Sequence, residues 1–302
     1  MTPMKRRLFI RNMVIGGAAA AFGPRILPGQ TISAAGWPDL AAVEGESPSA
    51  ITKQAINMLG GMGRFISKGD KVVIKPNVGW DRTPEMAACT NPEVVKALVE
   101  LVLDAGAKEA IVIDNTINQA KRCYVRSGIL EAVKQTDGKM IYVDEHRIKK
   151  MNIHGEWLKE WNVVLDVLEA DKIINVPIAK HHSLSRLTMG MKNWLGAVGG
   201  ARNQLHQKLN HAMVDLTAFF KPTITVLDSY RILVRNGPQG GRLSDTKLVK
   251  TVAAGTDPVA VDAFGASLFG LPAAELPFLL LAGERGLGTY ELEKVKFEKR
   301  KI

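Results

Sequence analysis

Four short predicted strands constrain the fold of this chain more than any other feature. They are Lys71–Lys75, Ala110–Ile113, Lys172–Val176 and Thr223–Leu227. Ala110–Ile113 is a near-continuous apolar run, which is typical of a strand buried on both faces of a sheet, as in parallel sheets. Helical patterns separate them, and strands alternating with helices predict an α/β fold: a mostly parallel sheet with helices on both faces.

The clearest helix lies between the first two strands. Asn91 is a predicted N-cap with Pro92 at the first helical position, and apolar residues follow at helical spacing until Gly106. Other predicted helices cover 50–59, 129–133, 203–220, 257–268 and 275–284, and further strands cover 140–143 and 249–253. The predicted organisation is an export signal over 1–35, a lead-in over 36–67 that begins with a linker (36–49), and an α/β domain over 68–302.

One basic segment follows the strand that ends at Val176. Residues 172–214 contain no acidic residue and six basic ones, at Lys172, Lys180, Arg186, Lys192, Arg202 and Lys208. They also hold four of the six histidines, at 181, 182, 206 and 211, and a glycine-rich run, 196–200, whose backbone amides could approach an anion. Because ligands of α/β folds lie beyond the carboxyl ends of strands, this segment is the predicted site.

The charge of the whole chain supports a local site. The formal net charge is +10, but five of the 40 basic residues and none of the 30 acidic ones lie in residues 1–35. The remaining 35 against 30 leave +5, and the +6 of residues 172–214 leaves the rest of the chain near −1. A nucleic-acid-binding protein would spread its basic residues over a face with aromatic residues between them. We therefore expect a small anionic ligand and no nucleic acid.

The residue types in this segment predict roles. Lys180 and Lys192 are point charges suited to a carboxylate or phosphate, and Asn193 can orient the same group. His181 or His182 can act as a general acid or base, or as a metal ligand, and cationic neighbours should lower their pKa. Since adjacent residues of a strand point to opposite faces, one of this pair is expected to be structural. The catalytic candidates are His181, His182 and Lys192, and the substrate-binding candidates are Lys180, Asn193, Lys75, Asn77 and His206.

The cofactor is left open by the sequence. His181, His182 and His206 are the metal-ligand candidates. Cys89 and Cys123 are the only cysteines, and an iron–sulfur cluster generally takes four thiolates, so none is expected. The two thiols could form a disulfide, but buried, unpaired thiols are favoured.

Several acidic positions have both structural and functional interpretations. Asp114 follows a predicted strand, where α/β proteins place functional polar groups. Asp257 is expected to be an N-cap, and Asp262, one turn later, a buried support or a site carboxylate. Asp215 is expected to form a surface pair with His211, one helical turn before it.

Residues 176–196, Val-Pro-Ile-Ala-Lys-His-His through Lys192-Asn193-Trp-Leu-Gly, resemble the central signature of the domain-of-unknown-function family 362. The flanking motifs match too: Lys75-Pro76-Asn77 with Thr90-Asn91-Pro92, Asn236-Gly237-Pro238 with Gly240-Gly241, and residues 255–262. The resemblance spans about 68–270. It implies the α/β fold more firmly than a reaction. Some members carry an appended ferredoxin-type cysteine domain that this chain lacks, so electron transfer is not implied.

The N-terminus resembles a twin-arginine export signal. Arg6-Arg7 precede a Gly/Ala-rich apolar run at 13–22, and Ser33-Ala34-Ala35 offer small residues for cleavage before Gly36. The expectation is export through the twin-arginine translocase to the periplasm, with no permanent membrane span once the signal is cleaved. An uncleaved anchor and a cytosolic amphipathic helix are the alternatives.

Two functions fit these residues. The favoured one is an exported enzyme that acts on a small anionic substrate, with proton transfer or with metal or cofactor assistance. The alternative is a non-catalytic periplasmic carrier that uses the same cationic cleft to hold an anionic ligand or cofactor.

Overall fold

A ten-stranded sheet forms the centre of the molecule. The computed structural model describes residues 36–302, so the predicted export signal lies outside the described residues. Eight strands run side by side in the order β12 (Phe297–Lys301), β1 (Leu40–Glu44), β11 (Thr246–Gly255), β10 (Ile224–Leu233), β7 (Lys172–Val176), β2 (Lys71–Pro76), β3 (Glu109–Val112) and β4 (Lys139–Met140). Outside this row, β8 (Ile178–His182) pairs with β10 and with β9 (Arg186–Thr188). A separate hairpin joins β5 (Ile148–Asn152) and β6 (Glu160–Val164).

The strands of the main sheet are mostly parallel. The parallel pairs are β1/β12, β7/β10, β8/β10, β2/β7, β2/β3 and β3/β4. The antiparallel pairs are β1/β11, β10/β11 and β8/β9. The predicted α/β class with a mostly parallel sheet is therefore confirmed.

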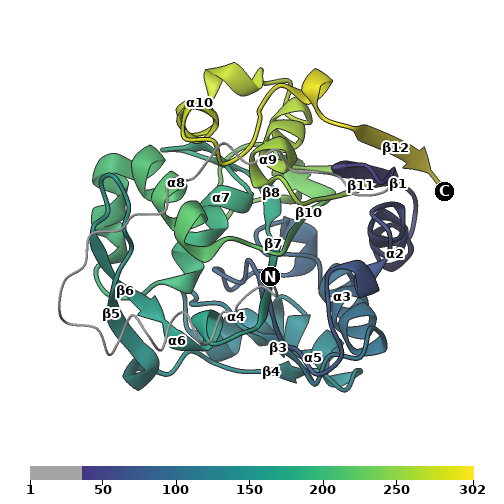
Figure 1. The fold of residues 1–302 in the computed structure, drawn as a ribbon, viewed down its shortest axis with the longest axis horizontal. Helices are drawn as coiled ribbons and strands as arrows, with labels where there is room; N and C mark the ends of the chain where they lie inside the picture. Colours follow the sequence, from purple (N-terminus) through teal and green to yellow (C-terminus); the bar gives the residue numbers. More distant parts are fainter. Residues whose placement is uncertain (1–35) are drawn as a thin grey trace.

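Helices cover both faces of the sheet (Figure 1). The longer ones are α2 (Pro48–Met58), α3 (Pro92–Asp104), α4 (Ala120–Arg126), α5 (Ile129–Lys134), α8 (Leu209–Phe220), α9 (Pro258–Ser267) and α10 (Pro277–Glu284). Helices α2–α5 pack on one face, and α8–α10 pack on the other. The single-turn helices are α6 (Leu165–Leu168) and α7 (Gly190–Asn193). The 3-10 helices are η1 (Met62–Arg64), η2 (Pro84–Met86), η3 (Glu145–Arg147), η4 (Trp194–Ala197), η5 (Arg202–Lys208), η6 (Leu243–Asp245), η7 (Ala273–Glu275) and η8 (Leu292–Lys294).

The apolar strands divide their side chains between two cores. In β2, Val72 and Ile74 pack with α2 and α3, while Val73 packs with the β6 and α8 core on the opposite face. All three are fully buried. Successive strand residues point to opposite faces. A strand that is covered on both faces therefore needs apolar residues at successive positions. Each such side chain contributes roughly 1.5–3 kcal/mol of burial, which explains the continuous apolar runs.

The order of strands changes direction at β2. The chain continues from β2 to β3 and β4 on one side, then crosses to β7 on the other side of β2. Ligands of α/β sheets bind at such a switch, beyond the carboxyl ends of the strands. Here β2 ends at Pro76 and β7 ends at Val176, paired with each other.

The predicted linker 36–49 contains β1, a buried strand of the main sheet. Its partners, β11 and β12, lie more than 200 residues further along the chain. Local sequence patterns cannot reveal such a pairing. The predicted strand over 140–143 ends already at Met140, and the predicted helix over 203–220 begins as the 3-10 helix η5.

Two smaller expectations concern the cysteines and a helix cap. Cys89 and Cys123 are buried free thiols, as favoured. Asp257 caps α9, because its Oδ1 accepts the N–H groups of Val259 and Ala260 at 2.8 and 2.9 Å. Within 36–302, no helix has the length and apolar character needed to cross a membrane.

Candidate functional site

A buried polar cluster lies where β2, β3 and β7 end. Lys75 is the last but one residue of β2, and Asp114 follows β3 by two residues. The Lys75 ammonium donates to Asp114 Oδ1 at 2.5 Å, and both side chains are inaccessible to solvent or nearly so. Burial lowers the pKa of Lys75, and the charge of Asp114 opposes that shift. This ion pair leaves neither charge free.

Asn193, at the end of α7, joins the strand ends to one another. Its Nδ2 donates to Asn175 Oδ1 at 2.8 Å and to Lys75 O at 3.1 Å. Its Oδ1 accepts from Lys75 Nζ and from Asn77 Nδ2, both at 3.1 Å. These contacts use all the donors and acceptors of a carboxamide. Asn193 was expected to bind substrate, but the structure places it as the support that holds Lys75 and Asn77.

The glycine-rich run 196–200 packs against this cluster. A Cβ atom at position 196 would overlap with the Asp114 carboxylate and approach Lys75 Nζ to 2.7 Å. The Gly199 amide donates to Asn162 O at 2.9 Å. The run was expected to approach a bound anion, but at Gly196 it approaches the carboxylate of the protein's own Asp114.

Lys180, in β8, is 1 % exposed. Its ammonium donates to Asn77 Oδ1 at 2.9 Å and to Ala88 O at 2.5 Å, which accounts for two of its three protons. Burial lowers its pKa to about 8. It forms no ion pair with the described residues.

Lys192, on α7, has even fewer partners. It is 8 % exposed, and no hydrogen bond or ion pair of its ammonium is found within residues 36–302. Burial, and then the charge of Lys180, lower its pKa to about 7. Near neutral pH this amine is therefore present in both protonation states.

Asp262 fixes the position of α7. Its Oδ1 accepts the Gly190 N–H at 2.6 Å and its Oδ2 accepts the Met191 N–H at 2.9 Å. Burial raises its pKa to about 7, although the two amides act in the opposite direction. Of the two roles predicted for Asp262, the structure shows the buried support.

His182 faces the lysines and is buried. Its Nδ1 accepts the N–H groups of Leu184 and Ser185 at 3.1 and 3.3 Å, which assigns the ring proton to Nε2. Burial, and then the charge of Lys192, lower its pKa to about 3. The expected depression of a histidine pKa among cations is thus present, and it leaves His182 as a neutral donor with no free site for a proton.

His206 stacks on His182, with ring centroids 6.3 Å apart and planes within 15°. Burial and the charge of Lys192 lower its pKa as well. His181 points away from this group, as the alternation along a strand predicted, and its Nδ1 accepts the Gly237 N–H at 3.1 Å. The structure therefore brings His182 and His206 together and separates His181 from both.

The candidate metal ligands do not gather into a site. Across the described part of the chain, no three or more His, Cys, Asp or Glu side chains are placed to hold a metal ion. The expected surface pair of His211 with Asp215 is wrong. Asp215 is fully buried and accepts the N–H groups of Glu156, Trp157 and Leu158, as well as Arg285 Nη1 at 2.6 Å.

Two supports were not found from the sequence. Asn175 is a buried amide inside β7, which binds Asn193 and donates to Gly190 O at 2.9 Å. Asp228, in β10, accepts the Asn91 N–H at 2.7 Å, and burial raises its pKa to about 6. A polar residue inside a strand buried on both faces, such as Asn175, is the signal that could have revealed the first of them.

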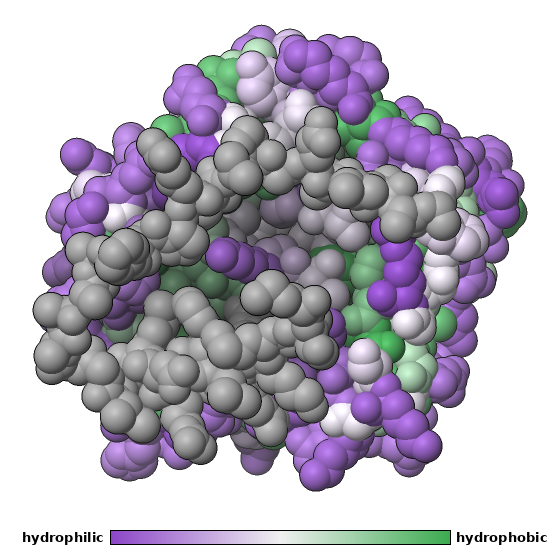
Figure 2. All heavy atoms as spheres, viewed as in Figure 1, coloured by the Kyte–Doolittle hydropathy of each residue, from purple (hydrophilic) through white to green (hydrophobic). Residues whose placement is uncertain are grey.

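The buried cations of this cluster differ in their partners. The charge of Lys75 is balanced by Asp114, while Lys180 and Lys192 have no carboxylate partner in residues 36–302. On the face of the molecule shown in Figure 2, hydrophilic residues form much of the outer rim, whereas Lys180 and Lys192 are only 1 % and 8 % exposed. The arrangement can bind an anion and, at Lys192, exchange a proton near neutral pH.

Comparison with known proteins places this arrangement in a family. The family model described as domain of unknown function DUF362 matches residues 72–267. This chain belongs to the DUF362 family. The matched range holds every residue of the cluster, from Lys75 to Asp262.

Two individual proteins are also similar. A thylakoid-associated protein from Synechocystis, sll1697, is 27 % identical over 258 residues, which cover 83 % of this chain and 78 % of that protein. The lactate racemase apoprotein from Thermoanaerobacterium thermosaccharolyticum gives a TM-score of 0.45 at 11 % identity. That match covers 76 % of this chain and just over half, 56 %, of the racemase chain.

Proposed function

We propose that this DUF362 protein is an enzyme that binds a small carboxylate or phosphate at Lys180 and Lys192 and transfers a proton through Lys192. The observation that carries the proposal is the unbalanced charge of these two buried ammonium groups. A buried charge without a partner is costly. A bound anion would supply the partner that the described residues lack.

Lys180 is the proposed anchor of the anion. Asn77 and Ala88 hold two of its protons and thereby fix the direction of the third. Its pKa of about 8 keeps most of it charged at neutral pH. A lysine held in this way is a fixed point charge for a carboxylate or phosphate oxygen.

Lys192 is the proposed acid and base. Proton transfer is most efficient when the pKa of the catalytic group lies near the working pH, and burial beside Lys180 brings Lys192 to about 7. His182 was the other candidate, but its Nδ1 is occupied and its pKa is about 3. In this proposal His182 donates from Nε2 to the anion, and His206 stacks behind it.

The test is hydrogen exchange from solvent into substrate. The full chain is incubated in D₂O with short carboxylates and phosphate esters that carry a C–H next to a carbonyl, and deuterium incorporation is followed by NMR. We expect exchange with at least one compound. Lys192→Met should remove the exchange and leave binding measurable, whereas Lys180→Met should weaken binding by roughly tenfold or more, the effect of losing a charge-assisted contact.

The same experiment tests the alternative, a non-catalytic carrier of an anionic ligand or cofactor. The fixed, buried position of Lys180 is compatible with that role, since a carrier needs no titrating group. Saturable anion binding without exchange in any compound would favour the carrier over the enzyme. His206→Ala should lower affinity for the anion only modestly in either case. The His206 ring stacks on His182, whereas Lys180 is held by Asn77 and Ala88.

We also propose that the protein acts after export. This rests on Arg6-Arg7 and the apolar run that follows them. Arg6→Lys with Arg7→Lys should retain the protein in the cytoplasm of cells fractionated into periplasm and cytoplasm. Unchanged periplasmic recovery of this variant would contradict a twin-arginine route.

A further inference from the structure

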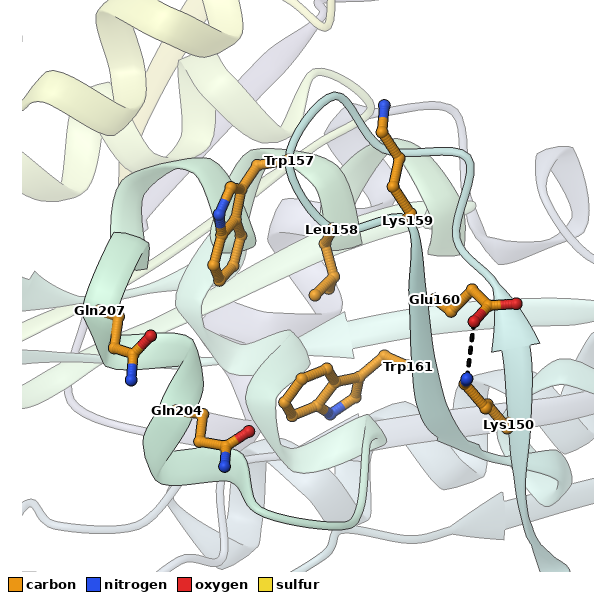
Figure 3. A pocket seen from close by; sticks show the side chains of 8 residues that line it. All are labelled: Lys150, Trp157, Leu158, Lys159, Glu160, Trp161, Gln204 and Gln207. Carbon is orange, nitrogen blue, oxygen red and sulfur yellow. Dashed lines mark ion pairs between the residues drawn. The ribbon is translucent and has the colours of Figure 1, made fainter.

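A pocket separate from the lysine cluster lies between the β5–β6 hairpin and η5 (Figure 3). Its volume is about 320 Å³, within the range of small-ligand sites. Its lining residues are Lys150, Trp157, Leu158, Lys159, Glu160, Trp161, Gln204 and Gln207. None of them takes part in the proposed proton transfer.

Contacts outside the pocket hold one indole ring and the backbone of the other tryptophan. Trp161 Nε1 donates to Gly199 O at 3.0 Å, which fixes the plane of its ring. The backbone N–H of Trp157 donates to Asp215 Oδ2 at 3.1 Å, and Arg285 Nη1 donates to Oδ1 of that buried carboxylate. An aromatic wall that is already in position loses little freedom when a ligand binds.

The polar groups of the pocket are two carboxamides. Gln204 and Gln207 are three residues apart in a 3-10 helix, where residues i and i+3 lie one above the other. Both therefore reach the same side, as Figure 3 shows. Both side chains are exposed, and neither has a hydrogen-bond partner among residues 36–302. Each offers donors and an acceptor to a ligand.

The charged side chains around the pocket are all exposed. Lys150 pairs with Glu160 at 2.6 Å, and the Lys159 ammonium donates to Gly155 O at 2.9 Å. None of these charges is buried, so none requires an ionic ligand, in contrast to the lysine cluster. The chemistry of the pocket favours a neutral ligand.

We propose that this pocket binds a neutral sugar ring of a carbohydrate. A sugar presents an apolar C–H face that can pack on an indole, and its hydroxyl groups both donate and accept hydrogen bonds, as the carboxamides of Gln204 and Gln207 do. A purely apolar ligand would leave both carboxamides unpaired as it excluded water. An anion would find no buried cation, since the one lysine of the lining without a carboxylate partner in residues 36–302, Lys159, is exposed to solvent.

The test is a titration of the full chain with cellotriose, maltotriose and chitotriose. Binding is followed by intrinsic tryptophan fluorescence and by calorimetry. We expect at least one trisaccharide to saturate with a dissociation constant on the order of 1 mM or tighter. Trp157→Ala, and the double variant Gln204→Ala with Gln207→Ala, should each weaken binding by roughly tenfold or more.

Matched variants separate binding from folding. Trp37→Phe, at an exposed tryptophan outside the pocket, should keep the affinity of the original chain. Should Trp157→Ala fail to fold, the glutamine double variant decides, because both glutamines are on the surface. No saturation with any of the three sugars, or affinity that survives loss of both glutamines, would overturn the proposal. Neither result bears on the lysine cluster.

Discussion

At the scale of single residues, the buried lysines Lys75, Lys180 and Lys192 differ chiefly in their partners. Lys75 and Lys192 are the two extremes. The Lys75 ammonium has Asp114 Oδ1 at 2.5 Å and two further oxygen partners, Pro76 O at 2.9 Å and Asn193 Oδ1 at 3.1 Å. For Lys192, burial and Lys180 both lower the pKa, and no nearby carboxylate opposes them. Lys75 therefore contributes to the fold, whereas Lys192 is retained at a cost in stability. Functional sites commonly retain such destabilising groups because activity requires them.

Replacing these two lysines should change stability in opposite directions. Lys192→Met removes a buried, unpaired charge and should raise the free energy of unfolding at pH 6 by about 1–3 kcal/mol. Lys75→Met leaves Asp114 buried without its partner and should lower it by about 3–5 kcal/mol. Urea denaturation of both variants and the original chain provides the measurement.

The pH dependence of stability gives a second check on Lys192. The pKa of Lys192 is about 7 in the folded protein and 10.5 as a free side chain. Between these values the unfolded chain binds a proton that the folded chain does not, so the original protein gains stability as pH rises. The advantage of Lys192→Met should therefore shrink from pH 7 to 10. A constant difference over this range would contradict the assigned pKa.

At the scale of elements, Lys192 lies on one of the shortest α-helices of the described chain. Helix α7 has four residues, too few to form a stable helix alone. Asp262 binds its first two amides, and Asn193 ties its end to β2 and β7. The geometry of the site thus depends on tertiary contacts and not on local helix propensity.

This dependence explains what the sequence could predict. The strands β2, β3 and β7 and the helix α3 carry strong local patterns, and they were predicted close to their observed bounds. The convergence of Lys75, Asn77, Lys180 and Lys192 followed from placing polar residues at strand ends. The separation of His181 from His182 followed from the alternation along a strand. The role of Asn193 and the support from Asp228 instead depend on hydrogen bonds between distant segments, which no local period encodes.

Two acidic residues of one segment provide a test at this scale. Asp262→Ala should lower the free energy of unfolding by about 1–3 kcal/mol, because it leaves the buried amides of Gly190 and Met191 unpaired. Asp257→Ala should cost about 0.5–2 kcal/mol, through loss of the α9 cap. Only Asp262→Ala should also weaken the binding of an anion such as sulfate at Lys180 and Lys192, since only Asp262 positions α7. Equal binding losses in both variants would show a general effect of destabilisation.

At the scale of the whole molecule, charge is unevenly distributed. Five basic residues lie in 1–35, and the positive charge that remains is concentrated in residues 172–214. Two lysines of that segment, Lys180 and Lys192, are buried without a carboxylate partner among residues 36–302. An anion that binds the folded chain but not the unfolded one must stabilise the whole fold. For one site the gain is about 2.7 kcal/mol at a ligand concentration 100 times the dissociation constant. The lysine cluster is thereby linked to global stability.

Sulfate should stabilise the protein in a pH-dependent way. It stays a dianion from pH 6 to 10, so changes in its effect report on the protein. Protonated lysines attract it, and Lys192 and Lys180 lose their protons around pH 7 and 8 in the free protein. The increase in melting temperature with sulfate, relative to chloride at equal ionic strength, should therefore be largest near pH 6 and decline toward pH 10.

The control must separate binding from the general stabilisation that sulfate gives most proteins. Lys180→Met combined with Lys192→Met removes both cations, so its melting temperature should respond to sulfate by the same small amount at every pH. The difference between the two proteins then isolates the site. If that difference is absent at pH 6, the two lysines do not form an anion site; if it persists undiminished at pH 10, their protons are not what the anion requires.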